Sequence, residues 1–172
     1  MKKILTLSYI LIQTISSKAL AGEGWAIPSP EFRKGGVEFV VCNDLPDEIL
    51  CLGISCVGNG YELVSVRSGS GPFTGVTKIS TTSGDFTAVF SDEEKPIGVV
   101  SSGTRARVSR DVIKAMAASH RFSIRETHPD PDEDRFSGAH LAELMKRTKG
   151  ACPPLNWMTP QRPLVPPLGR RR

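Results

Sequence analysis

The chain has 172 residues, of which 39% are hydrophobic and 23% charged, a composition typical of one globular domain. Its formal net charge of +4 comes from the two ends, because Lys2, Lys3 and Lys18 precede residue 22 and three arginines close the chain. Between these ends, residues 22–169 carry 16 basic and 18 acidic side chains. A nucleic-acid-binding domain carries a basic excess on its folded body, so this balance argues against DNA or RNA as a partner.

The first 21 residues follow the pattern of a secretory signal peptide. Two lysines precede an apolar stretch from Ile4 to about Ile15, and Ala19-Leu20-Ala21 supplies the small residues of a cleavage site. The apolar stretch is shorter than the ~20 residues that a membrane-spanning helix needs. Gly22, not a cysteine, follows the expected cleavage, so the pattern is not that of a lipid-anchored protein. We expect a periplasmic or extracellular product that begins after Ala21 and has no transmembrane segment.

Four cysteines lie in the expected mature chain, and an even number in an exported protein predicts disulfides. A zinc site would need C-x-x-C spacing or nearby histidines, and the cysteine spacings of nine, five and ninety-six residues provide neither. Four cysteines allow three pairings. Cys42 ends one predicted strand and Cys51 begins the next, so this pair can close a hairpin. That choice leaves Cys56 to anchor the end of the domain through Cys152.

Between Gly35 and Ser101 the apolar residues recur at every second position, as in strands with one buried face. Turn residues rich in Gly, Asn, Asp, Ser and Pro separate these runs and favour antiparallel connections. The predicted strands centre on Val37–Val41, Leu50–Ile54, Glu62–Val66, Phe86–Phe90 and Ile97–Val99.

Two helices and one further strand follow in the prediction. Ser109 is the expected N-cap of the first helix, whose apolar residues recur at helical spacing. A strand over 120–126 comes next. Ser137 is the expected N-cap of the second helix, which ends at Gly150. The predicted fold is mainly β with two helices (α+β), an antiparallel β-sandwich or meander covered by C-terminal helices.

The last twenty residues differ in composition from the rest of the chain. Residues 153–172 contain six prolines and end in three arginines, which is typical of an extended, weakly packed tail. Trp157 is the one tail residue expected to dock. The disulfide-bonded domain is therefore expected to span residues 22–152.

No catalytic set is recognisable in the sequence. It has no Gly-x-Ser-x-Gly, Ser-x-x-Lys or His-Glu-x-x-His motif and no glycine-rich phosphate loop, and oxidised cysteines are not nucleophiles. The acidic segment 128–134 is similar to the start of a calcium loop, but Arg135 replaces the required glycine and Leu141 the bidentate glutamate. We interpret it as a solvated acidic loop. The sequence thus predicts a binding protein with no catalytic residue, metal site or cofactor.

Arg121 and Arg125 are the first candidate binding residues, because they alternate with Phe122 and Ile124 along one predicted strand. Guanidinium groups placed in this way bind carboxylate or phosphate in a bidentate manner. The alternative is an ordinary solvated strand face. The expected partner is an envelope or host protein or glycan.

The loop that contains Ser68, Gly69, Ser70 and Phe73 is the second candidate. Its glycines allow close backbone approach to a partner, its hydroxyls offer hydrogen bonds, and Phe73 would be an apolar anchor. The alternative is a flexible hairpin turn.

Two resemblances bear on function. The segment Phe136-Ser137-Gly138-Ala139 through Leu141 to Cys152, with the strand Val37–Cys42 and the helix Val112–Met116, resembles the invasion-associated locus B family over residues 36–152. It is also similar to periplasmic proteins associated with type VI secretion. These resemblances imply a non-catalytic periplasmic β-sandwich that acts at the bacterial envelope or the host interface.

The other resemblance concerns the loop alone. Ser68-Gly69-Ser70-Gly71-Pro72-Phe73 is similar to the serine-glycine loop with which periplasmic lysozyme inhibitors enter the active cleft of the enzyme. Phe73 stands where those proteins prefer tyrosine. This resemblance implies lysozyme as an alternative partner.

Overall fold

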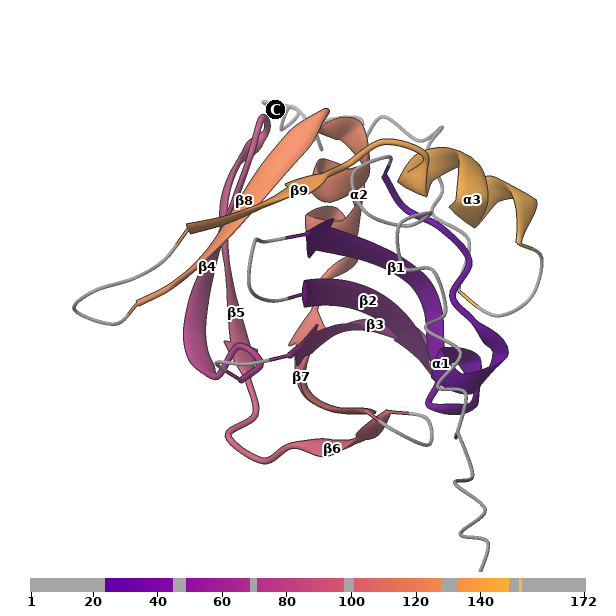
Figure 1. The fold of residues 1–172 in the computed structure, drawn as a ribbon. Helices are drawn as coiled ribbons and strands as arrows, with labels where there is room; N and C mark the ends of the chain where they lie inside the picture. Colours follow the sequence, from indigo (N-terminus) through magenta and orange to yellow (C-terminus); the bar gives the residue numbers. More distant parts are fainter. Residues whose placement is uncertain are drawn as a thin grey trace, which may run out of the picture.

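The computed structural model describes residues 24–44, 49–68, 71–97, 101–127, 133–148 and 152 (Figure 1). The strands within these ranges are β1 (Val37–Asp44), β2 (Ile49–Val57), β3 (Gly60–Arg67), β4 (Gly75–Thr81), β5 (Gly84–Phe90), β6 (Lys95–Ile97), β7 (Ser101–Val108), β8 (Arg121–Glu126) and β9 (Glu133–Ser137). The helices are α1 (Pro30–Lys34), α2 (Arg110–Ala118) and α3 (Leu141–Arg147). Within the described ranges, no helix is long and apolar enough to cross a membrane.

The strands form two antiparallel sheets, which confirms the predicted mainly β, α+β fold class. One sheet has the order β1-β2-β3-β7-β6 and the other the order β5-β4-β8-β9. The sheets face each other with crossing strand directions, and α2 lies beside them (Figure 1). They also meet where the edge strand β5 contacts β7, and where the edge strands β1 and β9 contact each other. This arrangement encloses one large core between the sheets.

The main core is built from alternate residues of both sheets, as the period-two pattern predicts. It includes Phe39, Leu52 and Leu63 from the first sheet and Ile79, Phe90 and Ile124 from the second, all at most 1% exposed. The helix α2 adds Val112, Ile113 and Met116, in agreement with the predicted apolar helix face.

Trp25 brings the N-terminal segment into this core. Its indole is 3% exposed and stacks on Phe122 at 6.5 Å, and Phe122 in turn stacks on Phe136 at 5.6 Å. The Trp25 backbone N–H donates to the carbonyl of Ala139 at 3.0 Å. A residue only four positions after the expected cleavage site is therefore an integral part of the fold.

A second, smaller cluster lies on the other face of the first sheet. Val37, Val64 and Ile97 are buried there, with Phe32 of α1 packed against them. Strand β3 is consequently buried on both faces, since Leu63 and Val64 are both 0% exposed. Val64 and Val66, which the alternation places on one face, pack in this smaller cluster, whereas Leu63 on the other face packs in the main core.

Both predicted disulfides are confirmed. Cys42 and Cys51 are paired residues of β1 and β2, so their bond closes the first hairpin. Cys56 of β2 bonds to Cys152, ninety-six residues away, and both cysteines pack against the main core. The second bond ties the chain that follows α3 back to the first sheet.

The structure corrects the predicted start of the last helix. Ser137 is the last residue of β9, where it pairs with Arg121, and α3 begins at Leu141. The strand pairing continues one residue further, because the Gly138 N–H donates to the His120 carbonyl at 3.0 Å. A Cβ atom at Gly138 would lie 1.8 Å from the Ser119 carbonyl oxygen, so only glycine fits. Helix formation is delayed until the chain has left this close contact.

The solvated acidic loop predicted over 128–134 is wrong at its C-terminal end. Glu133 and Asp134 lie in β9, and Asp134 is 5% exposed. Its carboxylate accepts a hydrogen bond from the Arg67 guanidinium at 2.6 Å. This ion pair joins the end of β3 in one sheet to β9 in the other.

We expect the tail to be dispensable for folding. Residues 153–172, including Trp157, lie outside the described residues, and the disulfide at Cys152 holds the end of the domain without them. Truncation after Pro154 removes prolines that cannot donate to a sheet, so we expect the melting temperature to change by no more than a few degrees. Differential scanning calorimetry of the two mature forms measures this. A loss of many degrees would instead show that Trp157 or its neighbours dock on the core.

Candidate functional site

The candidate site is the solvent-exposed side of the four-stranded sheet, which we call the outer face. On each strand, alternate side chains point away from the core and toward solvent. The twelve outer-face residues are Val76, Lys78 and Ser80 of β4; Asp85, Thr87 and Val89 of β5; Arg121, Ser123 and Arg125 of β8; and Glu133, Arg135 and Ser137 of β9. Four of them are basic and two are acidic.

The strand register brings these side chains into rows across the sheet. In one row, Ser80 pairs with Ser123, and Ser123 pairs with Arg135. In the adjacent row, Lys78 pairs with Arg125, and Arg125 pairs with Glu133. Side chains that are directly opposite on neighbouring strands have Cβ atoms about 4.5–5.5 Å apart. Basic side chains, hydroxyls and the carboxylate of Glu133 from three strands therefore share one surface.

Two of the four basic side chains have an acidic partner on this face. Lys78 contacts Asp85 at 2.7 Å, and this contact holds the pKa of the Asp85 carboxyl below its usual range, with help from Ser80. Arg135 lies 3.5 Å from Glu133.

The side chains of Arg121 and Arg125 form no ion pair or hydrogen bond with any residue that the structure describes. Both are exposed, on a strand whose intervening residues Phe122 and Ile124 are at most 3% exposed. The predicted alternation along β8 is thus present, with both arginines on the outer face. Their guanidinium donors are free to bind an anion.

Two shallow hollows lie next to these arginines. The Arg125 hollow has a volume of about 330 Å³ and is lined by Lys78, Ser80, Ser123, Arg125, Glu126, Thr127 and Glu133. The Arg121 hollow has a volume of about 260 Å³ and is lined by Val41, Cys42, Asn43, Arg121, Arg135, Phe136 and Ser137. The first hollow spans β4, β8 and β9, and the second extends from β8 over β9 to β1.

Lys78 and Arg135 are site residues that the sequence analysis missed. Each has a large apolar neighbour on one side only, Ile79 for Lys78 and Phe136 for Arg135, so the period-two signal is weaker than along β8. Lys78 lies between the buried residues Thr77 and Ile79, and Arg135 between the buried residues Asp134 and Phe136. The register, however, decides that both lie beside β8.

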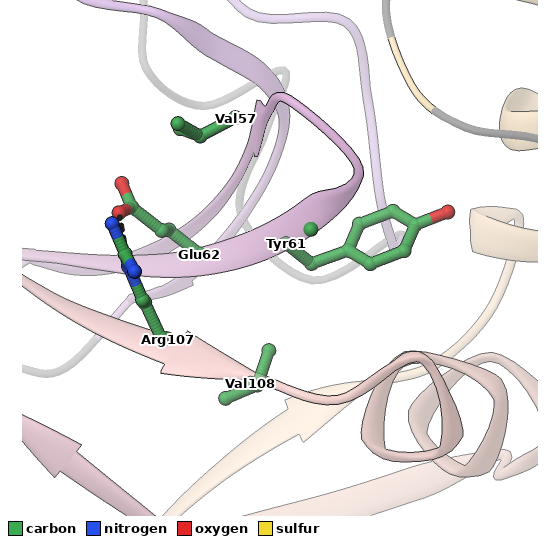
Figure 2. Close-up of a pocket in the computed structure, with 6 residues that line it drawn as sticks. Val57, Tyr61, Glu62, Arg107 and Val108 are labelled. Carbon is green, nitrogen blue, oxygen red and sulfur yellow. Dashed lines mark ion pairs between the residues drawn. The ribbon is translucent and has the colours of Figure 1, made fainter.

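Arg105 and Arg107 of β7, which precede Arg121 in the sequence, belong to a different surface. Arg105 lies 3.4 Å from Glu62 of β3. Arg107 lies 3.7 Å from the same carboxylate (Figure 2). Arg105 also donates to the Gly35 carbonyl at 2.6 Å. Glu62 and Arg107 line a third hollow, of about 240 Å³, and the two charged groups of that hollow pair with each other.

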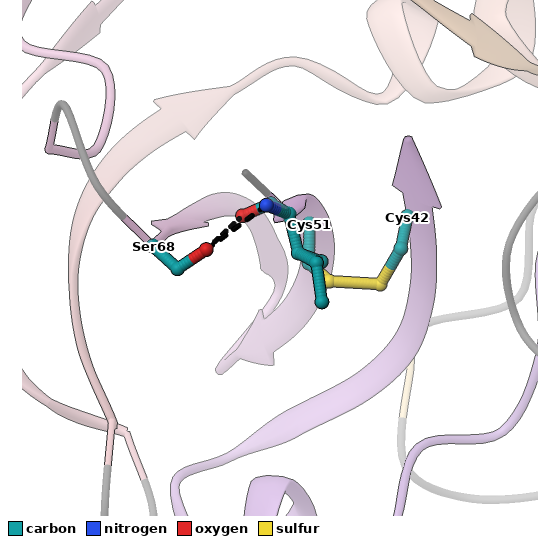
Figure 3. Close-up of a disulfide and its surroundings, with 4 residues drawn as sticks. Cys42, Cys51 and Ser68 are labelled. Atoms are coloured by element: carbon teal, nitrogen blue, oxygen red, sulfur yellow. Dashed lines mark hydrogen bonds between the residues drawn. A yellow bond between two sulfur atoms is a disulfide. The ribbon is translucent and has the colours of Figure 1, made fainter. Parts of the chain in front are cut away.

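The described part of the serine-glycine loop is held by the domain. Ser68 is exposed, but its hydroxyl oxygen accepts a hydrogen bond from the Ile49 N–H at 2.9 Å, next to the Cys42–Cys51 disulfide (Figure 3). Phe73 is 2% exposed and contacts Phe90 at 5.7 Å. Its N–H donates to the Ser65 hydroxyl at 3.0 Å.

Phe73 is therefore a core residue, which corrects the expectation that it is an exposed anchor. The ring is buried because removing an aromatic side chain from water stabilises the fold by several kcal/mol, at about 25 cal/mol per Å² of apolar surface buried. Gly69 and Ser70 lie outside the described residues, so their predicted roles stay predictions.

The described residues contain no group of three or more His, Cys, Asp or Glu side chains that could hold a metal ion. His120 and His140 are exposed and lie in the connections before β8 and α3, and His128 lies outside the described residues. A search of known protein families, characterised proteins and solved structures finds no match to this chain.

Proposed function

We propose that this chain is a non-catalytic exported protein that binds an anionic component of the bacterial envelope or of a host through the outer face. Export is supported by the signal-peptide pattern of residues 1–21 and is compatible with the two disulfides. The resemblance to the invasion-associated locus B family, and to periplasmic proteins of type VI secretion, points to the same compartment.

The observation that carries the binding proposal is the pair of arginines on β8. Both are exposed, and neither has an ionic partner among the described residues. A hydrogen bond to a charged group contributes about 1.5–3 kcal/mol, and a planar guanidinium can form two in parallel with a carboxylate or phosphate. Lys78 and Arg135 add positive charge beside them, which favours encounter with anions.

The first test measures binding of the mature chain to three anionic probes: oligogalacturonate, polyaspartate and inorganic polyphosphate. We expect the Arg121→Gln and Arg125→Gln double variant to lose affinity by about a hundredfold, because each arginine contributes a charge-assisted contact. Raising the ionic strength from about 0.01 M to about 0.15 M should also weaken binding, since the screening length falls from about 30 Å to about 8 Å. Isothermal titration calorimetry provides both readouts.

Lys95→Gln with Arg110→Gln is the matched control. It removes the same charge at two exposed residues of β6 and α2, away from the outer face. This control should retain wild-type affinity within about twofold, because it leaves the contacts intact. If neither the wild type nor the control binds any of the three probes, the proposed function is wrong.

The lysozyme-inhibitor alternative makes a separate prediction. It requires the mature chain to slow cell-wall hydrolysis by lysozyme, and replacement of Ser68 and Ser70 with bulky residues to abolish the effect. Failure to inhibit any lysozyme class at micromolar protein eliminates that alternative and leaves the outer-face proposal standing. We expect this negative result, because Phe73 lies in the core and offers no ring to the cleft.

A further inference from the structure

From the arrangement of the two hollows we infer that the anionic ligand is an extended acidic polysaccharide that lies along β8 and occupies both hollows at once. This inference rests on the proposed function and names its ligand class. Three features carry it: the distance between the two arginines, the hydroxyls that line the hollows and the absence of aromatic anchors on the described outer face.

The spacing favours a long ligand. Arg121 and Arg125 are four residues apart on one strand, and strands rise about 3.3 Å per residue, so the two positions are about 13 Å apart. Each arginine lines a different hollow. Ser123 of the Arg125 hollow and Arg135 of the Arg121 hollow are paired residues, so the two hollows are direct neighbours. A single carboxylate or phosphate fills one of them, whereas a chain with repeated charges can reach both.

The side chains between the charges favour a sugar. Ser80 and Ser123 line the Arg125 hollow, and Ser137 lines the Arg121 hollow. A hydroxyl side chain is both a donor and an acceptor, which matches the hydroxyl groups of a glycan. The alternation of arginine and serine along β8 thus matches a chain that alternates acidic and hydroxyl groups.

The aromatic residues of the sheet argue against two other polyanions. Phe86, Phe90, Phe122 and Phe136 pack in or against the main core. Phe136 also borders the Arg121 hollow, but it is only 3% exposed and presents no open ring face to a ligand. Protein interfaces use exposed aromatic residues as energetic anchors, and single-stranded nucleic acids are bound by stacking of bases on such residues. The described outer face offers neither an anchor nor a stacking platform.

The test titrates the mature chain with oligogalacturonates of one to about eight rings, which carry one carboxylate per ring. We expect affinity to rise by about tenfold or more once the oligomer spans both hollows and then to level off, because the second contact becomes intramolecular. Arg121→Gln and Arg125→Gln, tested singly, should each remove this gain with length. Each should weaken binding of the shortest oligomer by only about twofold, since the other hollow remains and a short oligomer occupies only one.

Two further probes with the same number of charges separate the ligand classes: polyaspartate and single-stranded oligodeoxythymidylate. We expect both to bind at least about tenfold more weakly than the matching oligogalacturonate. Replacing Ser80, Ser123 and Ser137 together with alanine should reduce this preference for the glycan. Thermal melting of each variant checks that the fold is unchanged.

The outcomes are distinct. Affinity that does not depend on length means that one hollow binds one anion, and stronger binding of polyaspartate or of the oligonucleotide means a peptide or nucleic-acid ligand. Any of these results overturns the inference and leaves the anion-binding function in place. Absence of binding to every probe overturns the proposed function itself.

Discussion

Replacing Cys56 and Cys152 together with serine should lower the free energy of unfolding by about 4–5 kcal/mol. The chain-entropy estimate grows with the length of the loop that the bond closes, and this loop spans ninety-six residues. The bond also holds the end of the domain, because α3 itself has only Leu141 fully buried. For a domain of this size, the change corresponds to a fall in melting temperature of about 10–20 °C, measurable by calorimetry.

Serine replacement of Cys42 and Cys51 is the matched control, with the same chemistry and again no free thiol left over. Its loop spans nine residues, for which the same estimate is about 2.5 kcal/mol. The paired strands β1 and β2 also remain adjacent without the bond. Hydrogen exchange should show faster exchange in α3 only for the long-loop variant. An equal loss of stability in both variants would contradict the explanation that the stabilisation depends on the length of the closed loop.

Arg67→Met should cost about 3–5 kcal/mol of stability, because it removes the counter-charge that contacts a buried carboxylate. Arg67 and Asp134 are 2.6 Å apart, with side chains 11% and 6% exposed, and breaking a buried ion pair from one side is strongly destabilising. The guanidinium also lies 5.5 Å from the centre of the Phe73 ring, so its loss removes a cation–π contact as well. Urea unfolding followed by circular dichroism measures the change.

Lys78→Met provides the comparison, because Lys78 and Asp85 lie at nearly the same separation, 2.7 Å, but are 50% and 56% exposed. Exposed pairs contribute about 0–1 kcal/mol, so this variant should unfold close to the wild type. Replacing Arg67 with Met and Asp134 with Leu together should recover part of the loss, since an apolar pair can substitute for a buried ion pair. If the two single variants unfold at the same urea concentration, burial does not strengthen the Arg67–Asp134 pair.

Much of the fold was predictable from the sequence, because it depends on local pattern. Alternation in twos identified the strands that carry large apolar residues, and helical spacing identified α2 with its buried residues Val112 and Ile113. The disulfide pairing followed from the positions of Cys42 and Cys51 at the ends of adjacent strands. Alternation with Phe122 and Ile124 likewise placed Arg121 and Arg125 on the outer face. Each of these inferences uses only residues of one element or of two consecutive elements.

Three strands, β4, β7 and β9, escaped prediction because few of their inward residues are large and apolar. In β4 the buried residues are Thr77 and Ile79. The buried positions of β7 include Thr104 and Ala106, and β9 buries Asp134 beside Phe136. Such residues have no apolar pattern of their own. In β7 and β9 the polar residues among them are buried because a group elsewhere in the chain forms a hydrogen bond with each. The Thr104 hydroxyl donates to the Phe73 carbonyl, and Asp134 contacts Arg67.

By itself, the sequence determined the mainly β fold class, the disulfide pairing and the exposure of the two arginines, because these depend on spacing along the chain. Only the tertiary structure decided that Phe73 is buried and that Lys78 and Arg135 join Arg121 and Arg125 on one face. The reason is physical: strand register sets which side chains become neighbours, and it is set by packing between segments far apart in sequence. The same register places the two hollows side by side along β8.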